Sequence, residues 1–343
     1  MSLVETKNQH PLISVAMCTY NGAEFLREQL DSIIAQSYRP LEIVIVDDNS
    51  TDETWSMLLD YQARFDEVAV YQNKKNLGYI KNFEKAISLC TGEYIALADQ
   101  DDIWLPEKLA TQFNQIQPVS LTYSAISFID ELGQPIHENI KSRRLSGRCH
   151  LGLLFHTCVT GHLLLVKREA VNKALPFPDA INAHDRWIPF VAAAMGGISA
   201  SDHVLSLYRL HVNNVSRQKK SFSPSAIFRR ITFSRHNPAL EKRLIFLQSC
   251  IASGLLNEDE KDLVEQLYRL SKQLRYKLYS SKLEKLLLEH EGVLLRQYEN
   301  PTKAARKLSK GKPAYVMNYY VYAVFVMPLY LCGKTIKSFF SFR

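Results

Sequence analysis

Polar residues follow three apolar stretches, each about as long as a buried strand. Carboxylates spaced like Asp99 and Asp101 are oxygen ligands for Mg²⁺ or Mn²⁺, which would bridge the phosphates of a substrate. Asp48 offers an acceptor for the imide N–H of a nucleotide base, and Tyr20 offers a ring on which a base can stack. A lone Asp after a strand is usually a helix cap, whereas this joint arrangement favours a site. The three runs are Thr19-Tyr20-Asn21, Asp47-Asp48 and Asp99-Gln100-Asp101.

The elements around these runs alternate between strand and helix. Strands are expected at 13–18, 41–46, 68–71 and 94–98, and helices at 23–37, after Thr51, at 79–90 and from Pro106. Short alternating elements indicate a parallel sheet with right-handed crossovers. In such a sheet ligands bind beyond the carboxyl ends of the strands, so the three polar runs are expected to meet there.

The pattern changes between about 119 and 212. Strands are expected at 121–129, 159–167 and 203–208, and a helix at 187–195. We expect this stretch to complete the sheet and to supply the side that binds an acceptor.

Several other classes of site are excluded. A dinucleotide fold requires G-x-G-x-x-G after the first strand, and this chain has a single glycine there, Gly22. The sequence contains neither a P-loop nor a nucleophile elbow. The six cysteines are scattered without a C-x-x-C pair, so no zinc or redox framework is expected. The polar first eleven residues lack the apolar core of a signal peptide, which favours a cytoplasmic location.

Three blocks of the sequence resemble family 2 glycosyltransferases, and the resemblance covers about residues 12–216. The form Asp-Gln-Asp-Asp-Ile-Trp resembles the rhamnosyltransferase-like branch of this family. The blocks are Ile13-Ser14-Val15-Ala16-Met17-Cys18-Thr19-Tyr20-Asn21-Gly22, Val44-Ile45-Val46-Asp47-Asp48-Asn49-Ser50-Thr51-Asp52, and Gly92-Glu93-Tyr94-Ile95-Ala96-Leu97-Ala98-Asp99-Gln100-Asp101-Asp102-Ile103-Trp104-Leu105-Pro106-Glu107-Lys108-Leu109.

The resemblance implies an α/β fold of the GT-A type: a Rossmann-like, mostly parallel sheet flanked by helices, followed by a C-terminal helical region. It also implies a nucleotide-diphosphate sugar donor, a divalent metal (Mn²⁺ or Mg²⁺) and inversion at the anomeric carbon. Asp101 matches the metal ligand of the family, and His211 is expected to complete the metal shell or contact the diphosphate. The residues expected to bind the nucleotide sugar are Thr19, Tyr20, Asn21, Asp48, Asn76, Gly78, Lys81, Asn82, Asp99 and Arg209.

Inversion by a single displacement requires a base on the acceptor side. His184-Asp185-Arg186-Trp187 resembles the later acidic motif of the family, so we expect Asp185 to be the catalytic base; a helix N-cap is the alternative. Gly161, His184 and Trp187 are expected on the acceptor side. A β-bulge at Gly161, a structural role for His184 and core packing of Trp187 remain alternatives. Arg209 is expected to offset charge on the leaving group.

The charge of the chain is uneven. Residues 1–111 hold 9 Lys/Arg and 18 Asp/Glu, a net charge of −9, which disfavours a nucleic-acid binder. Residues 216–343 hold 24 Lys/Arg and 10 Asp/Glu, a net charge of +14, which suits an anionic membrane leaflet. Residues 314–332 contain no charge, and we interpret them as an interfacial helix, with a single span or a packed helix as alternatives.

We therefore expect a glycosyltransferase domain at 1–215, with a nucleotide-sugar half at about 12–117 and an acceptor half at about 118–215. A basic helical region at 216–312 and a membrane-associating tail at 313–343 would follow. The expected reaction moves one sugar, rhamnose from dTDP-rhamnose, to a hydroxyl of a glycan or lipid-linked acceptor in cell-surface polysaccharide biosynthesis. The alternatives are a UDP-hexose donor, a sugar-phosphate nucleotidyltransferase, or a non-catalytic scaffold of a glycan-assembly complex.

Overall fold

The computed structural model describes residues 10–136, 144–155, 158–179, 181, 183–212, 214, 238–273, 281–290 and 294. The chain divides into two compact units. The first runs to residue 220 except for residues 154–156, and the second comprises those three residues and the chain from 221 onward. The expected boundary at 215/216 and the apolar segment 314–332 lie outside the described residues, as does all of 301–343.

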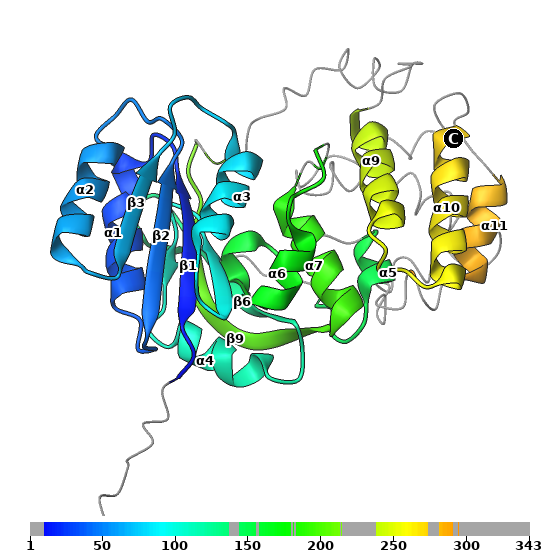
Figure 1. The fold of residues 1–343 in the computed structure, drawn as a ribbon, viewed down its shortest axis with the longest axis horizontal. Helices are drawn as coiled ribbons and strands as arrows, with labels where there is room; N and C mark the ends of the chain where they lie inside the picture. The colour runs from blue at the N-terminus through cyan, green and yellow to red at the C-terminus, as the bar shows by residue number, and fades with distance from the viewer. Residues whose placement is uncertain are drawn as a thin grey trace, which may run out of the picture. The chain divides into compact units, whose positions relative to one another are not determined.

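Within the described part of the first unit, nine strands form one sheet (Figure 1). Hydrogen bonds join them in the order β3-β2-β1-β4-β8-β6-β9-β5, and β7 pairs with β6. Their bounds are β1 Ile13–Thr19, β2 Leu41–Asp47, β3 Val68–Gln72, β4 Tyr94–Ala98, β5 Ile103–Trp104, β6 Leu121–Ile129, β7 Pro135–Ile136, β8 Leu164–Lys167 and β9 Ile198–Arg209.

The first four strands in this order are parallel, as the alternating pattern predicts. Thr19 lies beside Asp47 and Met17 beside Ala98, so β1, β2 and β4 end at the same edge. The α/β fold with a helix-flanked sheet is confirmed. Beyond β4 the pairing is mixed: β4–β8, β8–β6, β6–β7 and β9–β5 are antiparallel, whereas β6–β9 is parallel.

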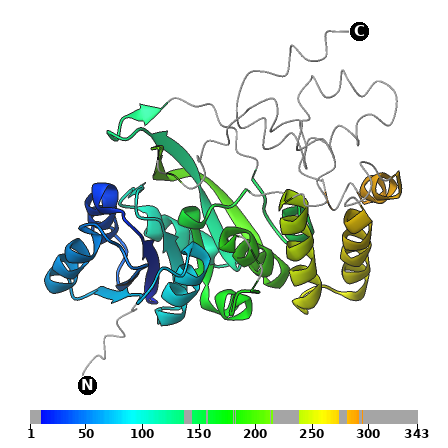
Figure 2. The same cartoon turned by 90° about the horizontal axis from the view of Figure 1, so that it is seen from above.

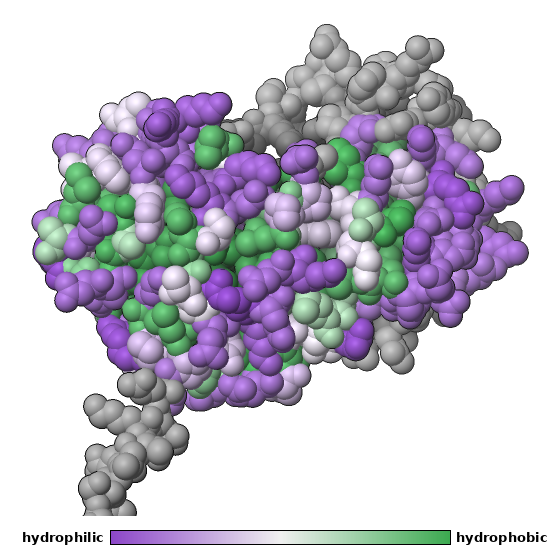
Figure 3. Space-filling model, viewed as in Figure 1, coloured by the Kyte–Doolittle hydropathy of each residue, from purple (hydrophilic) through white to green (hydrophobic). Residues whose placement is uncertain are grey.

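Helices cover both faces of the parallel strands. In Figure 1, α1 (Ala23–Ile34) and α2 (Thr54–Arg64) lie on one side of β1–β3, and α3 (Tyr79–Leu89) lies on the other. Strands covered on both faces must be apolar throughout, and every residue of β1 is buried. Hydrophobic residues show over these strands and α3 in Figure 3, surrounded by hydrophilic ones. The core between β1, β2 and the helices includes Val15, Ile43, Ile45, Leu26, Leu30, Ile33, Leu58 and Tyr61.

The second half of the unit departs from the expected elements at several points: β7 was not expected, and β9 begins at Ile198 rather than at residue 203. Residues 159–167 were expected to form one strand, but Gly161–Leu163 form a 3₁₀ turn (η1) and β8 begins only at Leu164. Figure 2 shows β6 and β9 running alongside each other, and their pairing carries register shifts near Ala125. The remaining helices of the unit are α4 Lys108–Ile116, α5 His150–Leu153, α6 Arg168–Ala174 and α7 His184–Met195.

The described part of the second unit contains three helices, which lie within the expected helical region: α9 Pro238–Ala252, α10 Glu258–Gln273 and α11 Ser281–Glu289. Asn257 and Glu260 form a reciprocal capping box at the start of α10, with the Asn257 Oδ1 accepting from the Glu260 N–H at 2.9 Å. Among the described residues, no helix has both the length and the apolar character needed to span a bilayer.

Candidate active site

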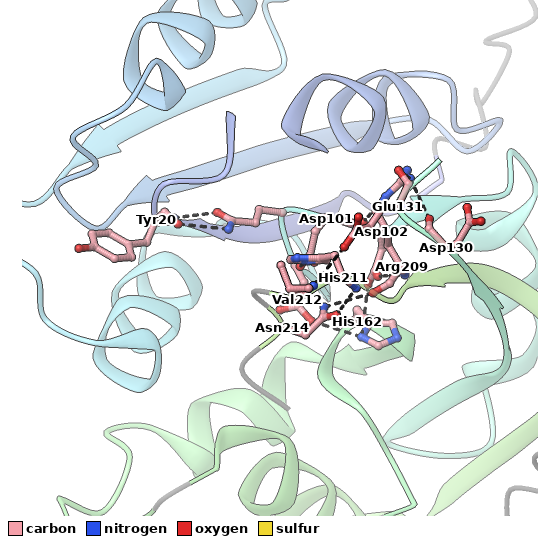
Figure 4. A network of polar contacts seen from close by, with 12 residues as sticks. Tyr20, Asp101, Asp102, Asp130, Glu131, His162, Arg209, His211, Val212 and Asn214 are labelled. Atoms are coloured by element: carbon pink, nitrogen blue, oxygen red, sulfur yellow. Dashed lines mark hydrogen bonds and ion pairs between the residues drawn. The ribbon is translucent and has the colours of Figure 1, made fainter. Parts of the chain in front are cut away.

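Asp99 to Asp102 leave the end of β4, and each side chain contacts a different part of the chain. Asp99 Oδ2 lies 3.3 Å from His162 Nδ1, and Asp101 Oδ2 lies 2.8 Å from His211 Nε2. Asp102 Oδ1 accepts a hydrogen bond from the Arg209 backbone N–H at 3.2 Å. The end of β4 is therefore the point at which the two halves of the unit meet (Figure 4).

Gln100 connects this run to the loop after β1. Its Oε1 accepts from the Tyr20 N–H at 2.8 Å, and its Nε2 donates to the Tyr20 carbonyl at 3.2 Å. A methyl group on Gly22 would lie 2.3 Å from Gln100 Oε1, so only glycine leaves room for this contact. Tyr20 is 47% exposed, and its ring points away from the aspartates in Figure 4; stacking of a base on this ring stays a prediction.

Thr19 and Asn21 shape the same loop from within the protein. Thr19 is 2% exposed, and its Oγ1 donates to Asp47 Oδ1 at 3.0 Å. Asn21 has a φ of 46°, and its Oδ1 accepts from the Thr51 N–H at 2.8 Å. Both side chains make hydrogen bonds to the end of β2 or to the residues that follow it. They therefore support the loop next to the expected nucleotide.

Asp48 lies at the end of β2 and holds the segment that leads into α3. Its Oδ1 accepts from Asn73 Nδ2 and from the Leu77 N–H, both at 2.8 Å, and its Oδ2 accepts from the Gly78 N–H at 2.9 Å. Gly78 has a φ of 79°, which a residue with a Cβ rarely adopts. The expected nucleoside acceptor therefore also anchors Leu77 and Gly78, within the segment that carries the other residues expected to bind the nucleotide sugar.

The expected residues on either side of Gly78, which are Asn76 before it and Lys81 and Asn82 on α3, divide into buried and exposed ones. Asn82 is 1% exposed and bridges Asn73 Nδ2 to the Val46 carbonyl, with both contacts at 2.8 Å. Asn76 Oδ1 accepts from the N–H of the residue two positions on, at 3.0 Å. Lys81 is exposed and lies 3.3 Å from Glu84 and 3.7 Å from Asp179.

Asp101 and His211 form the pair that the sequence suggested for a metal. Their side chains are 15% and 8% exposed, and the His211 ring packs against Phe25 at 4.8 Å. The Asn214 Oδ1 accepts from the His211 N–H at 2.6 Å and holds the turn that carries the imidazole. Burial raises the pKa of Asp101, and Asp99 adds to the shift. A carboxylate oxygen and an imidazole nitrogen facing each other are a donor set that fits Mn²⁺.

Arg209 differs from what we expected. It is 0% exposed, so its guanidinium presents no surface to a leaving diphosphate. Nε donates to the Asp101 carbonyl at 3.1 Å, Nη1 donates to the Asp130 and Glu131 carbonyls at 3.3 and 3.0 Å, and Nη2 donates to Glu28 at 2.5 Å (Figure 4). These contacts fix the backbone of Asp101, so the geometry supports a positioning role.

His162 and Asp102 were not among the expected site residues. Both side chains are 0% exposed, and they lie 3.4 Å apart. Burial raises the pKa of Asp102 to about 7 and lowers that of Lys108, also fully buried, to about 7. Asp99, Asp102 and His162 offer atoms within 4.8 Å of one another, which makes them a second group able to hold a metal. No sequence spacing announces this group, since His162 lies 63 residues from Asp99.

The acceptor-side residues come together at the start of α7. A methyl group on Gly161 would lie 3.0 Å from His184 Nε2 and 3.8 Å from Asp185 Cβ. His184 is buried against Phe83, with ring centroids 4.2 Å apart, and burial lowers its pKa. Burial raises the pKa of Asp185, Asp99 raises it further, and the neighbouring His184 opposes the shift.

Trp187 belongs to the packing between α6 and α7. It is 4% exposed, its Nε1 donates to the Ala174 carbonyl at 2.9 Å, and its ring stacks on Phe190 at 5.7 Å. This leaves little surface for an acceptor, and the core interpretation explains its place.

Comparison with known proteins identifies what this arrangement is similar to. Residues 14–173 match the family described as Glycosyl transferase family 2. An uncharacterized glycosyltransferase of Methanocaldococcus jannaschii is 30% identical over 190 residues, which cover 53% of this chain and 65% of the relative. A second, from Rickettsia prowazekii, is 28% identical, with 59% of this chain and 64% of the relative covered. The chain thus spans less than two thirds of the length of these relatives.

A putative teichuronic acid biosynthesis glycosyltransferase of Bacillus subtilis, TuaG, is 26% identical, with 62% of this chain and 84% of the relative covered. Among solved structures, S. aureus TarS 1-349 in complex with UDP has a TM-score of 0.54 at 16% identity, covering 94% of this chain and 92% of that one. The mannosyltransferase PcManGT of Pyrobaculum calidifontis, in complex with GDP-Man and Mn²⁺, has a TM-score of 0.54 at 18% identity, covering 95% and 89%. At these identities the likeness is one of fold, and the expected GT-A fold is confirmed.

Proposed function

Residues 14–173 of the chain belong to glycosyl transferase family 2, and from this membership we propose that the protein is an inverting glycosyltransferase. The proposed reaction moves one sugar from a nucleotide-diphosphate sugar to a hydroxyl of a glycan or lipid-linked acceptor during cell-surface polysaccharide synthesis. The B. subtilis relative named for teichuronic acid biosynthesis supports this process.

One observation carries the proposal. Two consecutive residues of η1 contact both sides of the candidate site: the His162 ring meets Asp99, and Gly161 lies against His184 and Asp185. The carboxylate expected near the donor and the expected base therefore both lie beside η1. A displacement reaction requires this closeness, because donor and acceptor must be brought within reacting distance.

Asp185 is the proposed base. The acceptor oxygen forms a bond to the anomeric carbon as the bond to the diphosphate oxygen breaks, and the hydroxyl proton passes to the Asp185 carboxylate. The raised pKa of Asp185 suits this role, since a more basic carboxylate takes a proton more readily. His184 packs behind it, and its lowered pKa favours a neutral imidazole that does not compete for the proton.

Asp101 and His211 are the proposed metal-holding residues. A divalent cation bound there would supply positive charge for the departing diphosphate. Arg209 keeps the Asp101 backbone in place through its Nε contact, and Asn214 does the same for His211. Tyr20 and Asp48 are proposed to hold the base of the nucleotide.

The donor is proposed to be dTDP-rhamnose, on the resemblance of Asp99 to Trp104 to the rhamnosyltransferase-like branch. The test is a binding and hydrolysis screen with Mn²⁺ or Mg²⁺ against dTDP-rhamnose, UDP-glucose, UDP-galactose, UDP-N-acetylglucosamine and GDP-mannose. Metal-dependent turnover of one donor is the expected result. A folded protein that binds none of these, nor any from a broader panel, would favour a non-catalytic scaffold instead.

Two substitutions test the assigned roles. Asp185→Asn is expected to bind donor normally but to stop transfer, and Asp66→Asn, on an exposed turn, is the matched control that keeps wild-type transfer. Asp101→Ala is expected to lose metal-dependent turnover while its thermal unfolding stays close to wild type. Retained transfer by Asp185→Asn would remove this residue as the base.

The basic region 216–312 and the tail 313–343 are proposed to hold the protein at the cytoplasmic face of the membrane, near a lipid-linked acceptor. Deletion of 301–343 is expected to release the protein from anionic vesicles in a sedimentation assay. Unchanged sedimentation would place the membrane contact elsewhere in the chain.

A further inference from the structure

His162 is held rigidly although no role in the reaction requires it. Its side chain is 0% exposed, and its ring stacks on Tyr208 with centroids 5.1 Å apart and planes 13° apart. Its backbone carbonyl accepts a hydrogen bond at 3.0 Å from Lys108 Nζ, which also donates to Ser206 Oγ at 3.0 Å. Both the ring plane and the main chain of His162 are therefore fixed by buried contacts.

The two ring nitrogens of His162 have different surroundings. Nδ1 lies 3.3 Å from Asp99 Oδ2 and 3.4 Å from Asp102 Oδ2. Nε2 is buried, and it has no hydrogen-bond partner among the described residues. A carboxylate oxygen accepts, so the contact with Asp99 places an N–H at Nδ1. Asp102 Oδ2, slightly farther away, makes no hydrogen bond within the described part of the chain.

Asp99 depends on this contact more than Asp102 does. The Asp99 side chain is 40% exposed, and within the described part of the chain the His162 ring is the one hydrogen-bond partner of its carboxylate. Asp102, by contrast, is also held through the Arg209 backbone N–H. A half-exposed carboxylate with a single restraint would turn freely once that restraint was lost.

We propose that His162 is a positioning residue whose Nδ1–H holds the Asp99 carboxylate in the orientation that binds the donor nucleotide. This inference deepens the proposed function and rests on it. The part of the donor concerned is the sugar–phosphate side of the nucleotide, because Asp99 is near both the candidate metal residue Asp101 and the candidate base Asp185.

A metal held by Asp99, Asp102 and His162 is the competing explanation of the same cluster. The nearby Lys108 disfavours it, because this fully buried amine is bonded to the His162 carbonyl and interacts with Asp102. Its Nζ already donates to the His162 carbonyl and to Ser206 Oγ, and its protonated form would repel a dication beside it. The experiment below separates the two explanations.

The test compares three substitutions of His162. Asn places its amide N–H at the δ position, where Nδ1 stands, whereas Gln places it at the ε position and Leu has none. We expect His162→Gln and His162→Leu to raise the KM for the nucleotide sugar roughly tenfold, the worth of about one hydrogen bond to a charged group, with kcat little changed. His162→Asn is expected to stay within about threefold of wild type.

Thermal unfolding of each variant separates positioning from folding, and the Asn/Gln pair carries the comparison if the Leu variant does not fold. Equal KM values for the Asn and Gln variants would overturn the proposal. A higher Mn²⁺ requirement with an unchanged donor KM would overturn it in favour of the metal explanation.

A measurement that needs no turnover keeps this inference separate from the proposed function. In ¹⁵N-histidine-labelled protein, Asp99→Asn is expected to shift the His162 Nδ1 resonance, while Asp66→Asn leaves it in place. An unmoved resonance would refute the contact itself. A wild-type protein that turns over no donor, but shows the shift, would refute the proposed function and leave the His162–Asp99 contact supported.

Discussion

Replacing Arg209 separates two explanations of why β9 ends in an arginine. If Arg209 positions Asp101, its removal must destabilise the fold as well as the site, because its donors serve three backbone carbonyls. At about 1–1.5 kcal/mol net for each hydrogen bond, Arg209→Met should lower the free energy of unfolding by about 3–5 kcal/mol. The Glu28 contact adds little, since that side chain is 60% exposed.

The loss is measurable by differential scanning calorimetry. For a unit of about 200 residues, 1 kcal/mol shifts the melting temperature by about 2–4 °C, so a decrease of roughly 6–20 °C is expected. Glu28→Gln is the matched control and should keep both the melting temperature and turnover. An Arg209→Met protein that has the wild-type melting temperature, yet transfers no sugar, would refute the positioning role. It would favour instead a direct role of Arg209 in offsetting the charge of the leaving diphosphate.

Three further outcomes are expected. Gly22→Ala should raise the donor KM about tenfold, because its methyl group displaces Gln100. In a Gln100→Ala background, Gly22→Ala should not raise the donor KM further. Additive increases in KM for the two substitutions would contradict a steric clash between them. Gly161→Ala should lower kcat between about tenfold and 100-fold, because its methyl group displaces His184, and the donor KM should stay unchanged. A wild-type kcat would show that catalysis does not require the space between Gly161 and His184. The rate of transfer should fall as the pH drops through the raised pKa of Asp185, because only the ionised carboxylate accepts a proton. If kcat falls only at a pH at or below 3.8, the ordinary pKa of an aspartate, Asp185 is not the base.

The sequence predicts the parallel half of the fold well because its signals are local. The apolar runs that form β1, β2 and β4 are bounded by turn residues, and their carboxyl ends carry the polar runs. β4 and β6 match their expected bounds to the residue. In contrast, β5 is two residues long and exists only because it pairs with β9, about a hundred residues away. No local pattern specifies such a strand.

The site residues divide in the same way. Asp101 and His211 were expected together, and the structure brings them to 2.8 Å. Arg209 was expected to face the leaving group, because an arginine beside a motif indicates a charge but not its burial. His162 was overlooked, since its six-residue spacing from His150 and His156 is neither a helical nor a zinc-ligand spacing, and its partner Asp99 lies 63 residues earlier in the chain. Its position directly after Gly161, in a run expected to be buried, was the available signal.

The run Asp99–Asp102 makes hydrogen bonds to residues that are distant in the sequence, and this affects when the site can form during folding. Its contacts span separations of 63, 80, 107 and 110 residues. Contacts of such high sequence separation form late, because long loops must close before the contacts contribute. The partners Arg209, at the end of β9, and His211, just after it, also lie beyond residue 173, where the family match ends. A fragment cut at that point would contain every strand of the parallel half but neither the arginine nor the histidine that Asp101 requires. The smallest fragment that contains the complete site therefore extends at least through Asn214. During synthesis on the ribosome, the contacts of Asp101 and Asp102 could form only after the end of β9 had been translated.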